Sequence, residues 1–199
     1  TRIIYTAFER MKVDALAISS DDLPDVALLP VALRPAAVAA NLTEAGKPML
    51  PPAVYKTLKT RSGETVRAAI IGVVSDPPYG NMPSLRNSPD NYPWKVSDPV
   101  AALTRELPIA RKKADVVVLL YAGIRRSGLD LIRAVPGVDV LVVGRQMGVE
   151  QTLEKVGETW VVQNTDRGRV AGELGLTLDP KTKKVASAEL RNVNMAADI

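Results

Sequence analysis

The sequence predicts an α/β fold, and three observations support this prediction. Residues 115–120 and 138–143 are predominantly apolar runs of strand length, as expected for parallel strands that are buried on both faces. The segment between them has apolar residues at helical spacing, so the three segments together form a β-α-β unit. Residues 54–59 and 66–74 read as two further strands joined by the polar turn 61–64. The length of 199 residues suits one domain with a substantial core.

The N-terminal segment predicts a helix and then a short strand. Within residues 1–12, helical spacing relates the apolar residues Ile4, Ala7, Phe8 and Met11, which we expect to form the apolar face of the helix. Residues 13–18 read as a buried strand that ends in the polar cluster Ser19-Ser20-Asp21-Asp22.

Residues 75–98 are predicted to form a long loop rich in proline and asparagine, and a loop of this length is usually functional or mobile. Asp98 and Pro99 are a favoured N-cap and first residue for the helix that follows. The apolar face of this helix is expected to carry Val100, Leu103 and Leu107. Pro108 is expected to end or kink it.

The C-terminal half contains the β-α-β unit and three more strands. Ser127 is expected to cap the helix of the unit, which carries Leu131, Ile132 and Val135. Residues 159–163, 168–178 and 185–193 read as antiparallel strands, with a turn at 179–182 between the last two. Asp115 and Asp139 begin the two parallel strands, whereas functional sites in open α/β sheets gather at the carboxyl ends. We therefore interpret both aspartates as capping or turn residues.

The chain contains no histidine and no cysteine. Zinc, copper and non-haem iron sites rely on imidazole and thiolate, so the remaining oxygen ligands suit only magnesium, calcium or manganese. A histidine general base and a cysteine nucleophile are excluded as well. The formal net charge is +4, and the short basic clusters at 111–113, 125–126 and 181–184 are interpreted as solvated surface. Nucleic-acid binding is weakly supported, and no apolar run reaches the length of a membrane span.

A series of segments in a specific order covers nearly all of the chain. They are residues 13–18, Ala39-Ala40-Asn41-Leu42 with Gly46-Lys47-Pro48, Ile70-Ile71-Gly72-Val73, and residues 97–100, 114–120, 135–144, 161–163 and 168–176. Together they resemble the N-terminal metallophosphoesterase (calcineurin-like) domain of the 5′-nucleotidase and cyclic-nucleotide phosphodiesterase group. The resemblance implies a four-layer α/β/β/α sandwich that holds two divalent metal ions at strand ends.

The metal-binding positions of that family carry other residues here. Its Gly-Asn-His-Glu motif falls on residues 19–22, so that Ser20 replaces an asparagine ligand, Asp21 replaces a histidine and Asp22 ends the motif. Ala122 stands in place of a further histidine, and Gly144-Arg145-Gln146-Met147 stands in place of Gly-His-Ser-His. The opening Asp-x-His and Gly-Asp motifs have no counterpart, because the chain begins after them. Alanine cannot bind a metal and arginine adds a positive charge, so we expect no catalytic residue, no metal and no cofactor.

Some of these positions have a second interpretation. The Ser19–Asp22 cluster could bind one hard cation, although a strand-end turn is the more usual role. Ser20 and Arg145 are the candidates for an anion site in the vacated cleft. Tyr92 and Trp94 are the candidates for contact with a partner, or they pin the loop to the domain. Met147 is interpreted as a packing residue.

The prediction is therefore one metallophosphoesterase-like domain of residues 1–199 that lacks the first strands of its family and is not an enzyme. We expect a structural or partner-binding role, with a protein partner or the rest of a larger polypeptide covering the exposed sheet edges. The alternatives are a fragment of a 5′-nucleotidase-like, metal-dependent phosphoester hydrolase and a nucleotide- or anion-binding module. A periplasmic, cell-surface or extracellular location is implied by the resemblance alone.

Overall fold

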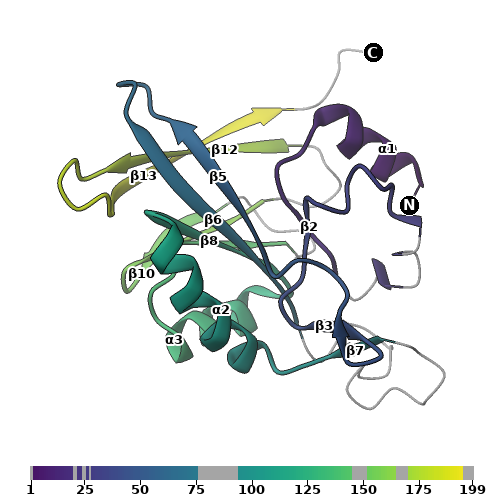
Figure 1. Cartoon of the computed structure of the whole chain (residues 1–199). Coiled ribbons are helices and arrows are strands. Elements are labelled where there is room, and N and C mark those ends of the chain that lie inside the picture. The colour runs from purple at the N-terminus through teal and green to yellow at the C-terminus, as the bar shows by residue number, and fades with distance from the viewer. Residues whose placement is uncertain are drawn as a thin grey trace.

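The central element of the computed structural model is a six-stranded mixed sheet with the strand order β10-β11-β9-β8-β6-β5 (Figure 1). The structure describes residues 2–19, 22–23, 26, 28–75, 94–144, 152–164 and 170–194. The strands of the sheet are β5 (Ala53–Lys59), β6 (Thr65–Val74), β8 (Val116–Ala122), β9 (Val140–Val143), β10 (Thr152–Val156) and β11 (Thr159–Gln163). Strands β6, β8, β9 and β11 are parallel, and β5 and β10 are antiparallel strands at the two edges.

Two helices cover one face of this sheet, α2 (Pro99–Lys113) and α3 (Arg125–Ala134) (Figure 1). The core between helices and sheet contains Leu103, Leu119 and Leu141, which are fully buried. Burial of these side chains is the main favourable contribution to folding, and it holds β8, α3 and β9 together. The predicted β-α-β unit and the predicted β5–β6 hairpin are both confirmed.

Helix α2 begins as predicted and continues past Pro108. The Asp98 carboxylate accepts a hydrogen bond of 2.9 Å from the Ala101 backbone N–H, which confirms the N-cap. Of the two outcomes expected at Pro108, an end or a kink, the first is wrong, because the helix continues to Lys113. Leu107 and Ala110, on either side of Pro108, are buried against the sheet, and this packing offsets the backbone hydrogen bond that proline cannot donate. Val100 is also not part of the buried face, since it is 41% exposed.

The N-cap of helix α3 lies three residues before the position at which the sequence indicated a cap. Its N-cap residue is Ile124, which provides no side-chain cap, so the prediction that Ser127 caps the helix is wrong. The Ser127 hydroxyl lies in the first turn, where it donates to the Ile124 carbonyl at 3.1 Å and accepts from the Tyr121 hydroxyl at 2.9 Å. Ser127 therefore joins the start of α3 to β8.

In the C-terminal third, some strands agree with the prediction and others differ from it. The hairpin of β12 (Val170–Leu178) and β13 (Val185–Asn194) is antiparallel as predicted, and the Asp179 carboxylate accepts from the Lys181 and Thr182 backbone N–H groups in the connecting turn. Strand β11 differs from the prediction, because it lies parallel to β9 inside the main sheet. Its antiparallel neighbour β10 was not predicted. Gly157 makes the β10–β11 turn with a φ of 59°.

The remaining elements surround a second apolar cluster. They are α1 (Arg2–Met11), β1 (Leu16–Ala17), β2 (Ala37–Val38), β3 (Leu42–Glu44), β4 (Lys47–Pro48) and β7 (Trp94–Val96). Strands β1 and β2 are parallel, whereas β3 pairs antiparallel with both β4 and β7.

Helix α1 packs on this cluster with a face that differs from the predicted one. Tyr5 is 3% exposed and Phe8 is half-buried, whereas Ile4 is 55% and Met11 is 67% exposed. Tyr5 and Phe8 satisfy helical spacing as well as the predicted set does, and the contact with the rest of the fold selects them. No helix in the described part of the chain has the length and apolar character needed to cross a membrane.

Candidate functional site

The candidate site lies where the parallel strands of the main sheet end. Strand β6 is followed by Ser75, β8 ends at Ala122 and β9 is followed by Gly144. The Ser75 N–H donates to the Ala122 carbonyl at 3.1 Å, and the Gly144 N–H donates to the Tyr121 carbonyl at 2.9 Å, so the three ends are joined. The carboxyl edge of a parallel sheet is the usual place for a functional site in an α/β protein.

The N-terminal segment is directed toward the same edge. The Ala40 N–H donates to the Gly72 carbonyl at 2.7 Å, and the next residue, Asn41, binds Val74, so the chain after β2 advances along β6 toward its end. Strand β1 is parallel to β2 and contacts β6 and β8. The polar cluster that begins at Ser19 therefore emerges on the side of the carboxyl edge.

Gly72 allows this close approach of the two segments. A Cβ atom at Gly72 would lie 2.2 Å from the Val38 carbonyl oxygen, a distance far below van der Waals contact. Only a residue without a side chain lets the backbone after β2 lie directly on β6. The position of the polar cluster near the strand ends therefore depends on this glycine.

Asn41 fixes the end of β6 from within the protein. Its side chain is fully buried, its amide nitrogen donates to the Val74 carbonyl at 2.7 Å and to the Ser97 carbonyl at 3.0 Å, and its amide oxygen accepts from the Val74 N–H at 2.8 Å. All of these bonds go to backbone groups. The side chain is therefore committed to holding β6 and the start of the segment before α2, and it is not available for a metal or a substrate.

Within the predicted polar cluster, the structure describes Ser19 and Asp22. The Asp22 Oδ2 atom accepts from the Ser19 backbone N–H at 2.9 Å and from the Ser19 hydroxyl at 2.6 Å. These are the local bonds of a turn at the end of a strand, in which an aspartate side chain satisfies a nearby backbone donor.

The other predicted site residues are only partly within the described structure. Ala122 is 5% exposed, and its methyl group is buried at the end of β8. Trp94 begins β7 opposite Glu44 and packs in part against the second apolar cluster. Ser20, Asp21, Tyr92, Arg145 and Met147 lie outside the described residues.

The described residues at this edge do not fit a centre of two divalent ions. Such a centre needs several carboxylate, amide or imidazole ligands that converge on each ion. Here the Asp22 Oδ2 atom accepts from Ser19, the amide of Asn41 is bonded to backbone, and the side chain of Ala122 has no ligand atom. In the described part of the chain, no group of three or more Asp or Glu residues could hold a metal ion.

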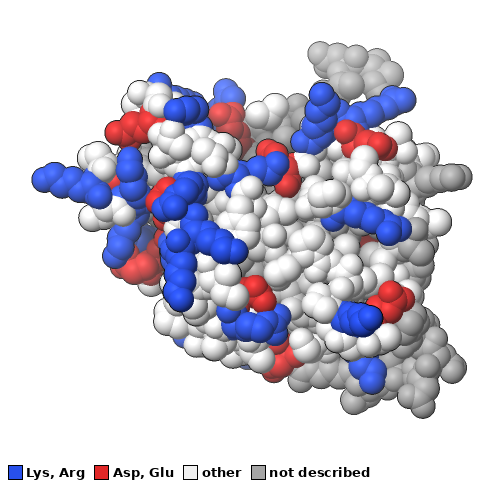
Figure 2. Space-filling model, in the orientation of Figure 1, with Lys and Arg blue, Asp and Glu red and all other residues white. Residues whose placement is uncertain are grey.

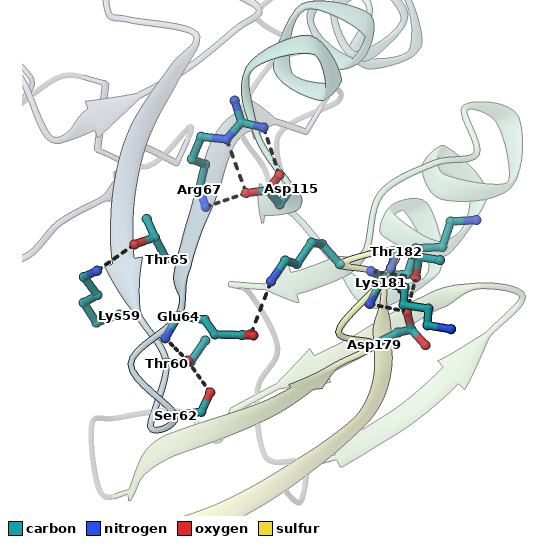
Figure 3. A network of polar contacts seen from close by, with 12 residues as sticks. Lys59, Thr60, Ser62, Glu64, Thr65, Arg67, Asp115, Asp179, Lys181 and Thr182 are labelled. Atoms are coloured by element: carbon teal, nitrogen blue, oxygen red, sulfur yellow. Dashed lines mark hydrogen bonds and ion pairs between the residues drawn. The ribbon is translucent and has the colours of Figure 1, made fainter.

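The opposite edge of the sheet contains the two aspartates at the strand starts. The Asp115 carboxylate accepts from the Arg67 backbone N–H at 2.8 Å and from its guanidinium at 2.9 Å (Figure 3). These hydrogen bonds from Arg67 lower the pKa of Asp115 from its usual value. Asp139 accepts from the Val117 N–H at 2.7 Å and pairs with Arg111 at 2.8 Å. Both carboxylates therefore bind the backbone of a neighbouring strand, so the interpretation of these residues as capping or turn residues is wrong, and they join adjacent strands of the sheet instead.

Two residues that organise these edges were missed by sequence reasoning, Asn41 and Arg67. Asn41 stands among apolar residues of a segment of strand length, and an uncharged amide in such a place signals a buried polar contact. Arg67 gave no signal, because its partner Asp115 lies far away in the sequence.

Comparisons with family models and with curated protein sequences found no match. Solved structures do match. A calcineurin-like phosphoesterase, YfkN from Bacillus subtilis, has a TM-score of 0.74 at 20% identity over 98% of this chain and 68% of its own. A protein of Staphylococcus aureus assigned as a 5′-nucleotidase, in complex with alpha-ketoglutarate, has a TM-score of 0.72 at 18% identity over 100% of this chain and 41% of its own.

A third match is the sulfate thiohydrolase SoxB of Thermus thermophilus in complex with glycerol. It has a TM-score of 0.63 at 19% identity and covers 79% of this chain and 28% of its own. The chain thus spans less than half of two of these proteins. Likeness at this level of identity concerns the fold and not the activity. This chain has the mixed α/β fold of the metallophosphoesterases, in the form shared by calcineurin-like phosphoesterases and 5′-nucleotidase-like proteins.

Proposed function

We propose that this chain is a metallophosphoesterase-fold domain that does not hydrolyse phosphoesters and that has a structural or partner-binding role in a larger polypeptide or assembly. The main support is Ala122. It lies at the carboxyl end of β8, where the family resemblance implies a histidine ligand, and its buried methyl group cannot bind a metal. The turn of Ser19 and Asp22 supports the same conclusion, because the carboxylate is already bonded to its neighbour.

Loss of the metal centre would remove most of the catalytic power of this fold. Two-metal hydrolysis needs ions about 3.5 to 4 Å apart, which activate the attacking water and stabilise the charge on the phosphoryl oxygens. Such electrostatic stabilisation is usually the largest single contribution to catalysis. A chain without histidine would have to build both metal sites from oxygen ligands alone.

An activity assay tests the absence of catalysis. We expect phosphate release from nucleoside monophosphates, and nitrophenol release from bis-nitrophenyl phosphate, to remain at background with added manganese. The matched variants are Asp22→Ala at the candidate site and Asp130→Ala on the exposed surface of α3. Turnover that Asp22→Ala abolishes and Asp130→Ala preserves would overturn the proposal. It would favour the alternative of a 5′-nucleotidase-like hydrolase fragment, to which the names of the matched structures also point.

Metal analysis is an independent measurement of the same site. After equilibrium dialysis against manganese, zinc or iron, we expect no stoichiometric binding to the chain. One bound equivalent that is lost in Asp22→Ala would contradict the proposal even if no activity were found, because it would show that the turn is a metal site.

An exposed apolar strip on α1 supports the partner-binding role. Ile3 is 85%, Ile4 is 55% and Met11 is 67% exposed, although all three belong to a helix whose other face is packed. Clustered exposed apolar side chains are typical of interaction surfaces. We expect the chain alone to self-associate in light scattering, and the double variant Ile4→Gln with Met11→Gln to reduce this association. Val193→Gln, at an exposed residue of β13, is the control. A monodisperse wild-type monomer would contradict this role.

A further inference from the structure

Three elements that are distant in sequence meet at the end of the molecule opposite the candidate site. They are the turn between β5 and β6, the C-terminal end of α2, and the turn between β12 and β13 (Figure 1). Lys183 of the β12–β13 turn pairs with Glu64 of the β5–β6 turn at 3.2 Å (Figure 3). Arg67 of β6 pairs with Asp115, directly after α2, at 2.9 Å. These ion pairs hold the basic residues of all three elements at one end.

Most basic residues of these elements make no ion pair. Within the described chain, six exposed cations of the three elements have no carboxylate partner, and we call this set the basic end: Lys59, Arg61, Lys112, Lys113, Lys181 and Lys184. Figure 2 shows Lys and Arg side chains gathered at the left of the view, where the β12–β13 turn lies in Figure 1. They project outward from the surface, with fewer acidic side chains between them. The ion pairs of this end use other residues, and Asp179 of the β12–β13 turn adds a carboxylate outside those pairs, so the cations outnumber the acidic residues and the end keeps a net positive charge.

We propose that the basic end docks the protein on an anionic lipid surface. Five of the six cations are lysines, which act as mobile point charges, whereas recognition of a planar or bidentate group favours arginine. The six cations belong to two turns and one helix end at the same end of the molecule. An extended charged surface such as a membrane can therefore contact several of them at the same time. Basic residues near an anionic membrane are attracted by its surface potential without any specific pocket.

An exposed apolar side chain accompanies the lysines of α2. Ile109 is 41% exposed and precedes Lys112 and Lys113 by about one helical turn, so it shares their side of α2. Apolar side chains next to lysines are typical of surfaces that insert shallowly at the headgroup boundary.

A nucleic acid fits this end less well than a membrane does. Binding of single strands relies on aromatic rings on which bases stack. Tyr55 is an aromatic residue at this end, and the Lys113 ammonium already lies 5.0 Å from the centre of its ring. This cation–π contact occupies a ring face that a base would need.

Vesicle co-sedimentation with the whole chain tests the proposal. We expect binding to phosphatidylcholine vesicles that contain phosphatidylserine, weak binding to pure phosphatidylcholine, and loss of binding at high salt. The test variant is Arg61→Gln with Lys112→Gln and Lys184→Gln. Each charge near such a surface contributes about fivefold in affinity, so three substitutions should weaken binding about a hundredfold.

The control variant removes the same charge elsewhere, by Arg10→Gln with Arg34→Gln and Lys47→Gln, three exposed residues outside the basic end. It should bind vesicles about as well as the wild type. Both variants must keep the wild-type thermal unfolding transition. Equal losses in both variants would overturn the proposal, because they would show a dependence on net charge alone. Binding to an oligonucleotide or to a poly-glutamate peptide, without binding to vesicles, would also overturn it.

Discussion

The side-chain amide of Asn41 binds both backbone groups of Val74, with distances of 2.7 Å to its carbonyl oxygen and 2.8 Å from its N–H. An amide group carries a donor nitrogen and an acceptor oxygen side by side, so one side chain can donate to the carbonyl and accept from the N–H of the same residue. The pair joins the segment after β2 to the last residue of β6. It therefore holds the carboxyl edge of the sheet in place from the buried side.

Replacement of Asn41 by alanine should strongly destabilise the protein. The buried N–H and carbonyl of Val74 and the carbonyl of Ser97 would lose their partner, and each buried unsatisfied group costs about 1 to 3 kcal/mol. We expect the free energy of unfolding in urea to fall by about 2 to 4 kcal/mol. The control is Asn192→Ala, at an exposed residue of β13. Comparable losses for the two variants would show that the buried bonds contribute little.

Replacement of Gly72 by alanine should be costly for a steric reason. The new methyl carbon would lie 2.2 Å from the Val38 carbonyl oxygen, and a backbone atom cannot move aside as a flexible side chain can. Overpacking of this kind costs about 1 to 3 kcal/mol or more in the free energy of unfolding.

Gly175 of β12 offers the matched control for this substitution. A Cβ atom there meets nothing closer than the Glu189 carbonyl oxygen at 3.9 Å, so Gly175→Ala should leave stability nearly unchanged. Thermal or urea unfolding of both variants makes the comparison. A stable Gly72→Ala variant would mean that the segment after β2 can shift away from β6.

The Arg67–Asp115 pair should make stability depend on pH in the acid range. Because Arg67 lowers the pKa of Asp115 in the folded state, the pair stabilises the protein above the unfolded value of about 3.9. This stabilisation is lost as the pH falls through the lower pKa of the folded state, where the carboxylate becomes protonated.

The variant Asp115→Asn isolates this contribution. Its free energy of unfolding should lie below that of the wild type at neutral pH, and the two should converge as the pH falls below about 4. Asp130→Asn removes the carboxylate of an exposed i,i+3 pair on α3 and should show no comparable convergence. A difference between Asp115→Asn and wild type that stays constant with pH would disagree with the lowered pKa.

The β3–β4 turn offers a stabilising substitution. Ala45 and Gly46 have φ angles of 48° and 76°. This left-handed conformation is energetically unfavourable for alanine, and asparagine tolerates it better. A left-handed residue costs roughly 1 to 2 kcal/mol, and we expect Ala45→Asn to recover part of this cost and so to raise the free energy of unfolding. Ala45→Val should lower it, because a β-branched side chain is disfavoured at positive φ. The reverse order of the two variants in urea unfolding would contradict the turn geometry.

The candidate site could be predicted from the sequence only in part. The absence of histidine and the alanine at position 122 are visible in the sequence itself, and the prediction that the chain holds no metal rests on them. The bond between Asp22 and Ser19 is local, so the residue types suggested it. The commitment of Asn41 to the backbone of β6 could not be predicted, because its partner lies 33 residues away.

The sequence alone determined the elements whose signals are local. The apolar runs of β8 and β9, the polar turn between β5 and β6, and the cap at Asp98 each depend on neighbouring residues, and all are confirmed. The tertiary structure decided everything that depends on distant contacts. It placed β11 beside β9, carried α2 past Pro108, and selected Tyr5 for the buried face of α1. In each case several local arrangements satisfy the same pattern, and only the burial of apolar surface against the rest of the fold distinguishes between them.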